Sequence, residues 1–338
     1  MPQITVRNLS KTYRVPERAP GLAAALRGLA RRSYRDVEAV RDVTFAVESG
    51  EIVGFIGPNG AGKTTTLKML SGLLHPSSGE ASVLGYVPWE RRPAYLRRIS
   101  MVLGNKSQLY WDIPPLDSFR VLAEIYGVPP EAYRETLDEL VAILEMEPLL
   151  TKPVRTLSLG ERMKCELVAG LIHCPAVLYL DEPTLGLDVS MQGRLRRFLA
   201  EVNRRRGVTM ILTSHYMADV VALCPRVILI HHGALLYDGP LAGLAHKLAP
   251  FKLIHVSLGN GHRTDLVRSL LSPDVELIEQ DGAQFTIRVS RDGAPGLTAR
   301  LLNTLPVVDL AVEDPPIEAV IDQVYQEGQV ANAGPQAE

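Results

Sequence analysis

The apolar residues of the chain fall into short continuous runs separated by helical stripes. Four such runs, each too short for a typical helix, lie at 52–56, 176–180, 208–212 and 227–230. Strands of a parallel sheet have this pattern because helices cover both faces of the sheet. Elsewhere, as in residues 133–145, apolar side chains recur at i, i+3, i+4 and i+7, the spacing of a helix with one buried face. The alternation predicts an α/β fold with a doubly wound parallel sheet.

Two regions of the first 240 residues depart from this alternation. Residues 105–170 have a mostly helical pattern, which predicts a helical subdomain inserted between strands. Near the start, Ile4 and Val6 alternate with polar residues and predict a strand. The stretch 14–36 interrupts this pattern before a strand resumes at 43–47.

The pattern changes again after a predicted helix and linker at 241–250. Four apolar stretches follow, KLIHVSL, VELIEQ, FTIRVS and VVDLAV, with helical segments and an Asp281-Gly282 turn between them. This order predicts a small α+β domain of the ferredoxin-like kind. We expect four parts in the chain, namely a main domain at 1–240, the linker at 241–250, the α+β domain at 251–327 and a flexible tail at 328–338.

Composition and charge narrow the function only slightly. The 338 residues are 46% hydrophobic and carry a net charge of −2, so we expect a globular core and no general affinity for polyanions such as nucleic acid. The sequence has no run of 18 apolar residues, so we predict no membrane-spanning helix. The segment MPQITVRNLS is not expected to be a signal peptide. The three cysteines show no CxxC spacing, which favours reduced core thiols.

The run at 52–56 leads into the most specific motif of the sequence. Eight residues match GxxxxGK[ST], namely Gly57, Pro58, Asn59, Gly60, Ala61, Gly62, Lys63 and Thr64. Glycines let backbone N–H groups turn around phosphate oxygens, and the next helix directs its positive end at them. Lys63 is predicted to reach the β- and γ-phosphates and Thr64 to ligate Mg²⁺, with Thr65 beside them. The motif indicates a P-loop NTPase and leaves kinases, GTPases and transport ATPases open.

Two adjacent carboxylates end the apolar run at 176–180. Asp181 is predicted to hold Mg²⁺, directly or through water, and Glu182 to polarise the attacking water. Two acids at the end of a buried strand are costly without a cation or hydrogen-bond partners. A solvated strand end is the alternative interpretation.

With both motifs in place, the sequence resembles ABC ATPases over about residues 1–240. The segment from Leu157 to Glu161 matches their signature motif, usually LSGGQ, although Leu159 replaces a glycine and Glu161 a glutamine. The resemblance implies that Ser158 and Gly160 contact the γ-phosphate bound by the opposite subunit, with Glu161 in the same motif. Ser158 and Glu161 also have the spacing of a capping box, and both interpretations can hold together.

Further residues follow in the order of the family. Asp188 ends the segment Leu185–Asp188, which matches the loop after the acidic pair, and His215 matches the family's switch histidine. Tyr13 matches the aromatic residue that stacks on adenine, with core packing as the alternative role and Tyr34 as a rival residue.

One family residue has two candidate positions. The family places a glutamine at the entry to its helical subdomain, where it senses Mg²⁺ and the membrane partner. Asn105 aligns with that position, and Gln108 lies three residues later. We predict that Asn105 serves there, with Gln108 as the alternative.

The resemblance implies a function for the whole chain. Two copies, or one copy and a paralogue, are expected to face each other head to tail, with each ATP and its Mg²⁺ between Gly57–Thr65 of one subunit and Ser158–Glu161 of the other. The motifs are most similar to ATP-binding subunits of ABC-2-type exporters, such as those for viologens or multiple drugs. Hydrolysis would then drive separate ABC-2-type membrane permeases from the cytoplasmic face of the membrane, with no nucleic acid involved.

Two other classes of P-loop protein remain as alternatives. Non-transport ABC ATPases of DNA repair carry long coiled coils between the two halves of the site, whereas only about 95 residues separate Lys63 from Ser158 and none forms a heptad run. Ribosome-associated relatives carry two such domains in one chain. A small-molecule P-loop kinase would need neither LSLGE nor the Leu185–Asp188 segment.

The stretch 14–36 forms a basic insert with six arginines and two acids. Its centre, LAAALRGLA at 22–30, favours a helix. The insert is either a solvated surface helix or a contact with the cytoplasmic membrane face or the membrane subunit, since anionic headgroups attract each nearby arginine by about 1 kcal/mol.

Overall fold

The computed structural model of the protein describes residues 2–17, 33–104, 106–214, 216–248, 251–259, 272, 275–316 and 319–321. The chain divides into two compact units, Met1–Gly239 and Pro240–Glu338, and each is described by itself. Among the described residues, no helix has both the length and the hydropathy needed to cross a bilayer.

A six-stranded sheet with the order β5-β6-β7-β3-β8-β9 forms the centre of the first unit. Its strands are β3 (Ile52–Ile56), β5 (Ile99–Leu103), β6 (Val177–Asp181), β7 (Thr209–Thr213), β8 (Arg226–His231) and β9 (Ala234–Pro240). The ladders of β3 with β7 and β8, of β5 with β6, and of β6 with β7 are parallel. All five residues of β3, β6 and β7 are buried, so the predicted parallel core is confirmed.

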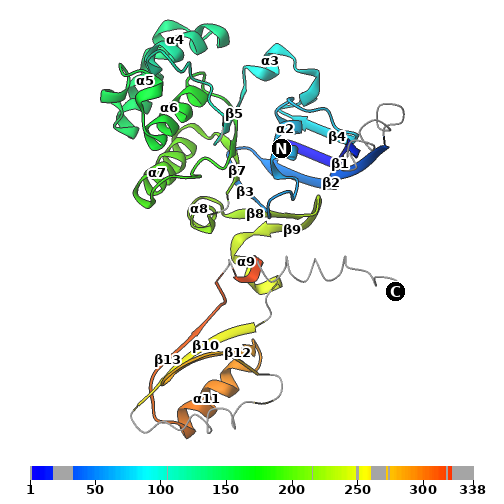
Figure 1. Ribbon diagram of the computed structural model, residues 1–338, viewed down its shortest axis with the longest axis vertical. Coiled ribbons are helices and arrows are strands. Elements are labelled where there is room, and N and C mark those ends of the chain that lie inside the picture. The colour runs from blue at the N-terminus through cyan, green and yellow to red at the C-terminus, as the bar shows by residue number, and fades with distance from the viewer. Residues whose placement is uncertain are drawn as a thin grey trace, which may run out of the picture. The chain divides into compact units, whose positions relative to one another are not determined.

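Helices pack beside this sheet in the first unit (Figure 1). The P-loop leads directly into α2 (Lys63–Leu70), and α3 (Pro93–Leu96) precedes β5. The stretch 105–170 contains α4 (Pro115–Tyr126), α5 (Pro130–Leu144) and α6 (Leu159–Leu171), with short 3₁₀ turns at Glu147–Leu149 and Val154–Thr156. Two more helices, α7 (Val189–Arg206) and α8 (Met217–Leu223), follow β6 and β7. Of these helices, α4, α5 and α6 lie between β5 and β6, in the stretch that was predicted to be mostly helical.

A three-stranded antiparallel sheet with the order β2-β1-β4 completes the first unit. It consists of β1 (Pro2–Glu17), β2 (Ser33–Glu48) and β4 (Ser78–Val83). The predicted interruption at residue 14 is wrong, because β1 continues to Glu17 and pairs with β2 as far as Ser33. Residues 18–32, the centre of the basic insert, lie outside the described residues. At its described edge, the guanidinium of Arg14 lies 4.7 Å above the ring of Tyr34.

The second unit contains a four-stranded antiparallel sheet with the order β11-β12-β10-β13. Its elements are α9 (Leu241–Leu248), β10 (Phe251–Leu258), β11 (Glu276–Asp281), β12 (Gln284–Ser290), α11 (Ala294–Thr304) and β13 (Val307–Glu313). Ile254, Phe285 and Ile287 pack against Leu297 and Leu301 of α11 in a buried core. The strand order is that of a ferredoxin-like fold, as predicted. The residues of the predicted tail, 328–338, lie outside the described part of the chain.

Candidate functional site

Close packing fixes the backbone of the P-loop between β3 and α2. A Cβ atom at Gly57 would lie 2.3 Å from the carbonyl oxygen of Ile230 on β8. At Gly62, which has φ of 105°, a Cβ atom would lie 2.4 Å from the carbonyl oxygen of Ala39 on β2. Only glycine fits both positions, and both sheets of the first unit therefore contact the loop.

Lys63, the first residue of α2, is folded against the loop that precedes it. Its ammonium donates to the carbonyl oxygens of Gly57 at 2.5 Å and Pro58 at 3.1 Å, and the residue is only 5% exposed. Burial lowers the pKa of Lys63, while the nearby charges of Glu182 and Asp181 act in the opposite direction. The cation therefore lies at the helix N-terminus, where a phosphate group would bind.

The two predicted acids stand at the end of β6, opposite the start of α2. The hydroxyl of Thr64 donates to both carboxylate oxygens of Asp181, at 3.1 and 2.9 Å, and the hydroxyl of Thr213 donates to one of them at 2.7 Å. Glu182 has φ of 54°, a conformation that a non-glycine residue rarely adopts. Its backbone N–H donates to the carbonyl and hydroxyl oxygens of Thr213, both at 3.1 Å, which holds this turn in place.

These residues surround a cavity of about 130 Å³. Its lining consists of Thr64, Lys68, Leu103, Gly104, Lys106, Asp181, Glu182 and Leu185. A hydroxyl and a carboxylate in contact at its wall are oxygen donors of the kind that Mg²⁺ prefers, with phosphate oxygens supplying further ligands. Among the described residues, no group of three or more His, Cys, Asp or Glu side chains could hold a metal by itself. The donor set therefore suits a cation that arrives with a phosphate ligand.

Ser158 caps the N-terminus of α6 in the predicted capping box. Its hydroxyl accepts from the N–H of Glu161 at 3.3 Å, and the Glu161 carboxylate accepts from the N–H of Ser158 at 2.8 Å. The hydrogen bond that the carboxylate accepts from the backbone N–H of Ser158 lowers the pKa of Glu161. Within the described chain, Ser158, Gly160 and Glu161 are not part of the cavity lining that contains Thr64. The signature residues therefore lie outside the cavity that Thr64 and the acidic pair line.

The loop after the acidic pair packs against this helix start. A Cβ atom at Gly186, which has φ of 74°, would lie 3.0 Å from the side chain of Leu159, and one at Gly160 would lie 3.2 Å from Met191. Asp188 caps α7 by accepting from the N–H of Met191 at 2.9 Å. The segment Leu185–Asp188 therefore connects the cavity, which Leu185 lines, to the signature residues.

Comparisons with known proteins decide the family. The family model described as "ABC transporter" matches residues 40–185, and the model "EvrA-like ABC transporter, C-terminal domain" matches residues 250–313. The ABC transporter ATP-binding protein NatA of Bacillus subtilis (strain 168) is 35% identical over 208 residues, which are 62% of this chain and 84% of NatA. The chain belongs to the ATP-binding subunits of ABC transporters.

Other relatives and solved structures agree with this family. The Nod factor export ATP-binding protein I of Burkholderia pseudomallei (strain 1710b) is 34% identical over 266 residues, 78% of this chain and 81% of that protein. A structure of an ATP-binding subunit of an ABC transporter has a TM-score of 0.60 at 26% identity, covering 72% of this chain and 92% of the other. A dimeric ATP-binding cassette with ADP and phosphate has a TM-score of 0.58 at 21% identity, which shows the shared fold.

The ABC ATPase presents Tyr13 on the three-stranded sheet. Tyr13 pairs with Val37 on β2, two residues from Ala39, which packs against Gly62 of the P-loop. Its ring is 36% exposed, and the ammonium of Lys11 lies 5.4 Å from the ring centre. Tyr13 is therefore not packed in the core, and its role in stacking on adenine stays a prediction, as does that of Tyr34, which is 42% exposed.

Two predicted site residues of the ABC ATPase, Asn105 and His215, lie outside the described residues. Gly104 and Lys106, on either side of Asn105, both line the cavity. Gln108 does not line it, and its side-chain amide donates to the carbonyl oxygen of Met101 at 3.3 Å. Next to His215, the Ser214 hydroxyl donates to the buried carboxylate of Asp219 at 2.8 Å.

Sequence reasoning did not identify three residues of the site, Lys68, Lys106 and Thr213. Thr213 was visible as a polar residue at the end of the apolar run 208–212, opposite the acidic pair in a parallel sheet. Lys68 lies one helical turn after Thr64 on the same face of α2, so its position followed from helical spacing. No local pattern indicated Lys106, because the fold of its loop brings it to the cavity.

Proposed function

We propose that the protein is the ATPase subunit of an ABC-2-type exporter, working as a head-to-tail pair with itself or a paralogue. The observation that carries the proposal is the cavity wall formed by Thr64, Asp181 and Glu182. The same unit also contains the capped helix α6 with the signature residues, which do not line this cavity. Each ATP would lie between the P-loop of one subunit and Ser158–Glu161 of the other. Two relatives support export as the direction of transport, since one is named for Nod factor export and another as a probable multidrug transporter protein.

In this proposal the residues of the cavity divide the chemistry among them. Lys63 binds the β- and γ-phosphates, Thr64 and Asp181 hold Mg²⁺, and Glu182 accepts a proton from the attacking water. Mg²⁺, when bound with ATP, would neutralise charge that develops on the phosphates. His215 and Asn105 are proposed to complete the site at the γ-phosphate, and Tyr13 to stack on adenine. The catalytic contribution is mainly positioning and charge stabilisation.

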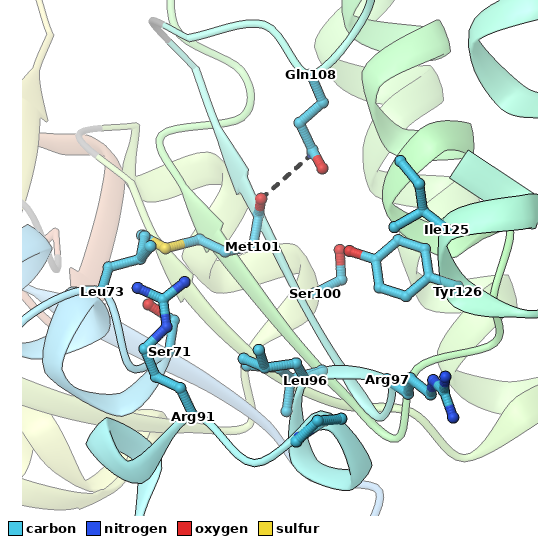
Figure 2. A pocket seen from close by; sticks show the side chains of 12 residues that line it. Ser71, Leu73, Arg91, Leu96, Arg97, Ser100, Met101, Gln108, Ile125 and Tyr126 are labelled. Atoms are coloured by element: carbon cyan, nitrogen blue, oxygen red, sulfur yellow. Dashed lines mark hydrogen bonds between the residues drawn. The ribbon is translucent and has the colours of Figure 1, made fainter. Parts of the chain in front are cut away.

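A groove on the first unit suits the proposed membrane partner. It has a volume of about 490 Å³ and is lined by residues of the loop after α2, of α3, β5 and α4, together with Gln108 (Figure 2). Leu73 and Ile125 on its walls are 54% and 63% exposed, and Tyr126 is stacked on His173 with ring centres 3.8 Å apart. An exposed apolar groove with a fixed aromatic wall is typical of a protein-binding site. We propose that a cytoplasmic segment of the membrane subunit binds here, which would place the ATPase at the cytoplasmic face.

Ile125→Asp is expected to reduce co-purification with the membrane subunit on the order of tenfold, because a carboxylate would be desolvated in the groove. ATPase activity of the isolated subunit should persist, since Ile125 is outside the phosphate cavity. The matched control is Val221→Asp on α8, where the side chain is 53% exposed and not in the groove. If both variants co-purify with the membrane subunit as well as the wild type does, the groove is not the docking site.

Asn105→Ala is expected to retain nucleotide affinity within about twofold and to lose stimulation of the ATPase by the membrane subunit. The reason is that a Mg²⁺- and partner-sensing amide contributes to coupling more than to ground-state binding. Gln108→Ala is the comparison, because its amide bonds to Met101 in the groove. Both variants are assayed with and without the membrane subunit in liposomes. If only Gln108→Ala loses stimulation, Gln108 serves in place of Asn105.

A further inference from the structure

The loop that follows β5 delivers a cation to the phosphate cavity. Leu103, Gly104 and Lys106 line this cavity together with Thr64 and Glu182, so the loop forms part of its wall. Lys106 is exposed, and its backbone N–H donates to the carbonyl oxygen of Leu103 at 3.3 Å. No motif of the P-loop, acidic pair or signature segment includes Lys106.

A buried carboxylate on α6 fixes the second half of the same loop. Glu166 is only 2% exposed, and it accepts hydrogen bonds from the Ser107 hydroxyl and from the backbone N–H of Gln108, at 3.2 and 3.0 Å to its two oxygens. Burial raises the pKa of Glu166, and these hydrogen bonds act in the opposite direction. A buried carboxylate without partners would be costly, so breaking these bonds disfavours any displacement of the loop.

Two further bonds stiffen the loop beside this anchor. The Ser107 hydroxyl also accepts from the N–H of Leu109 at 3.1 Å, and the Gln108 side chain donates to Met101 on β5, as Figure 2 shows. The loop is therefore held by α6 on one side and by β5 on the other. These bonds restrain the chain immediately after Lys106, which lines the cavity.

The charges around the cavity create a need for such a cation. Asp181 and Glu182 line it, and a terminal phosphate would add further negative charge beside them. Lys63 approaches from the P-loop side, where it contacts the carbonyl oxygens of Gly57 and Pro58. A cation on this loop, in addition to Lys68 of α2 in the same lining, would stabilise the third phosphate of ATP and contribute little to ADP, which lacks it.

We propose that Lys106 binds the terminal phosphate of ATP, and that Glu166 is the positioning residue that holds the loop carrying Lys106. This inference rests on the proposed function of the cavity. Because Glu166 lies on α6, whose first turn carries Ser158 and Gly160, the same contact connects the phosphate of one site to the signature residues of the same subunit.

The test compares the affinities of the full-length chain for a non-hydrolysable ATP analogue and for ADP, both with Mg²⁺, by calorimetry. Lys106→Met should weaken binding of the analogue about tenfold and binding of ADP by less than about twofold, because only the analogue carries the third phosphate. Lys106→Arg should restore most of the affinity, since it retains the charge. Lys152→Met, at an exposed lysine outside the cavity lining, is the matched control and should change neither affinity.

The role of Glu166 is tested by a double-mutant cycle. Glu166→Gln should lower the affinity for the analogue by a smaller factor than Lys106→Met does, and it should leave the affinity for ADP nearly unchanged. The double variant should bind the analogue almost as well as Lys106→Met alone. If Glu166→Gln does not fold, Ser107→Ala takes the place of that variant in the cycle, because it removes one hydrogen-bond donor to the Glu166 carboxylate. A thermal unfolding midpoint near that of the wild type verifies folding.

The outcomes separate this inference from the proposed function. Equal weakening of the analogue and ADP by Lys106→Met, or no weakening of either, would overturn the phosphate contact. Additive losses in the double variant would overturn the positioning role of Glu166. By contrast, failure of the wild type to bind the analogue would count against the proposed function itself.

Discussion

Glu182→Gln is expected to bind ATP and to hydrolyse it at least about 100-fold more slowly than the wild type. The amide keeps the size of the carboxylate and most of its hydrogen bonds but cannot accept a proton from water, and general-base catalysis typically contributes 10²–10⁴-fold. The backbone should be retained, because the main-chain N–H of Glu182, which the substitution leaves unchanged, donates to two oxygens of Thr213. Initial ATPase rates at saturating ATP measure the effect.

The same variant should also trap the dimer. If hydrolysis reopens a closed pair, a subunit that binds ATP without hydrolysing it should elute as a dimer in ATP and as a monomer in ADP. Size-exclusion chromatography in the two nucleotides distinguishes these states. The control is Glu182→Gln combined with Lys63→Ala, which should remain monomeric in ATP. A monomer with undiminished turnover would show that Glu182 is not the catalytic carboxylate.

Lys63→Ala is expected to weaken ATP binding on the order of 100-fold and to abolish measurable hydrolysis. Lys63 is the only residue of the Gly57–Thr65 loop with a cationic side chain, and charge-assisted hydrogen bonds to phosphate are the strongest polar contacts in such a site. Its ammonium lies at the loop already, in contact with the Gly57 and Pro58 carbonyl oxygens. Binding of a fluorescent ATP analogue and steady-state ATPase rates measure the two effects.

Folding of this variant needs a separate measurement, because the substitution removes two hydrogen bonds to loop carbonyl oxygens. The loop backbone is also held by the close packing of Gly57 against Ile230 and of Gly62 against Ala39, so we expect the fold to persist. Circular dichroism and a thermal unfolding curve verify this. A folded variant with wild-type turnover would refute the role of Lys63 in phosphate binding.

The sequence predicted the parallel core well because its strands are buried on both faces. Strands β3, β6 and β7 have every residue buried, so their apolar runs are continuous and their ends are sharp. The long β1–β2 hairpin was predicted only in part. Its ladder contains four register shifts, which interrupt the alternation, and its outer residues are exposed on both faces. β4, with the sequence SGEASV, is too polar and too short to give a periodic signal.

The site shows the same division between local and assembled features. The P-loop, the acidic pair and the capping box depend on neighbours in sequence. The structure forms the capping box and brings Thr64 of the P-loop into contact with Asp181, while the ligand-binding roles of these residues stay predictions. Lys106, Thr213 and Glu166 owe their positions to contacts between segments far apart in the chain, for example 59 residues between Ser107 and Glu166. Such pairings have no local pattern, and the roles of Asn105 and His215 stay predictions.

The packing of Leu159 against Gly186 has a consequence for timing within the pair. Leu185 borders a subunit's own phosphate cavity, while Leu159 stands in the signature segment that, in the proposed dimer, would contact the other nucleotide. Because the Gly186 backbone lies against the exposed Leu159 side chain, a displacement of one segment would require the other to repack. Loss of phosphate from one cavity would then change the contact between the signature segment and the nucleotide in the other site. The two hydrolysis events would then follow one another instead of occurring independently.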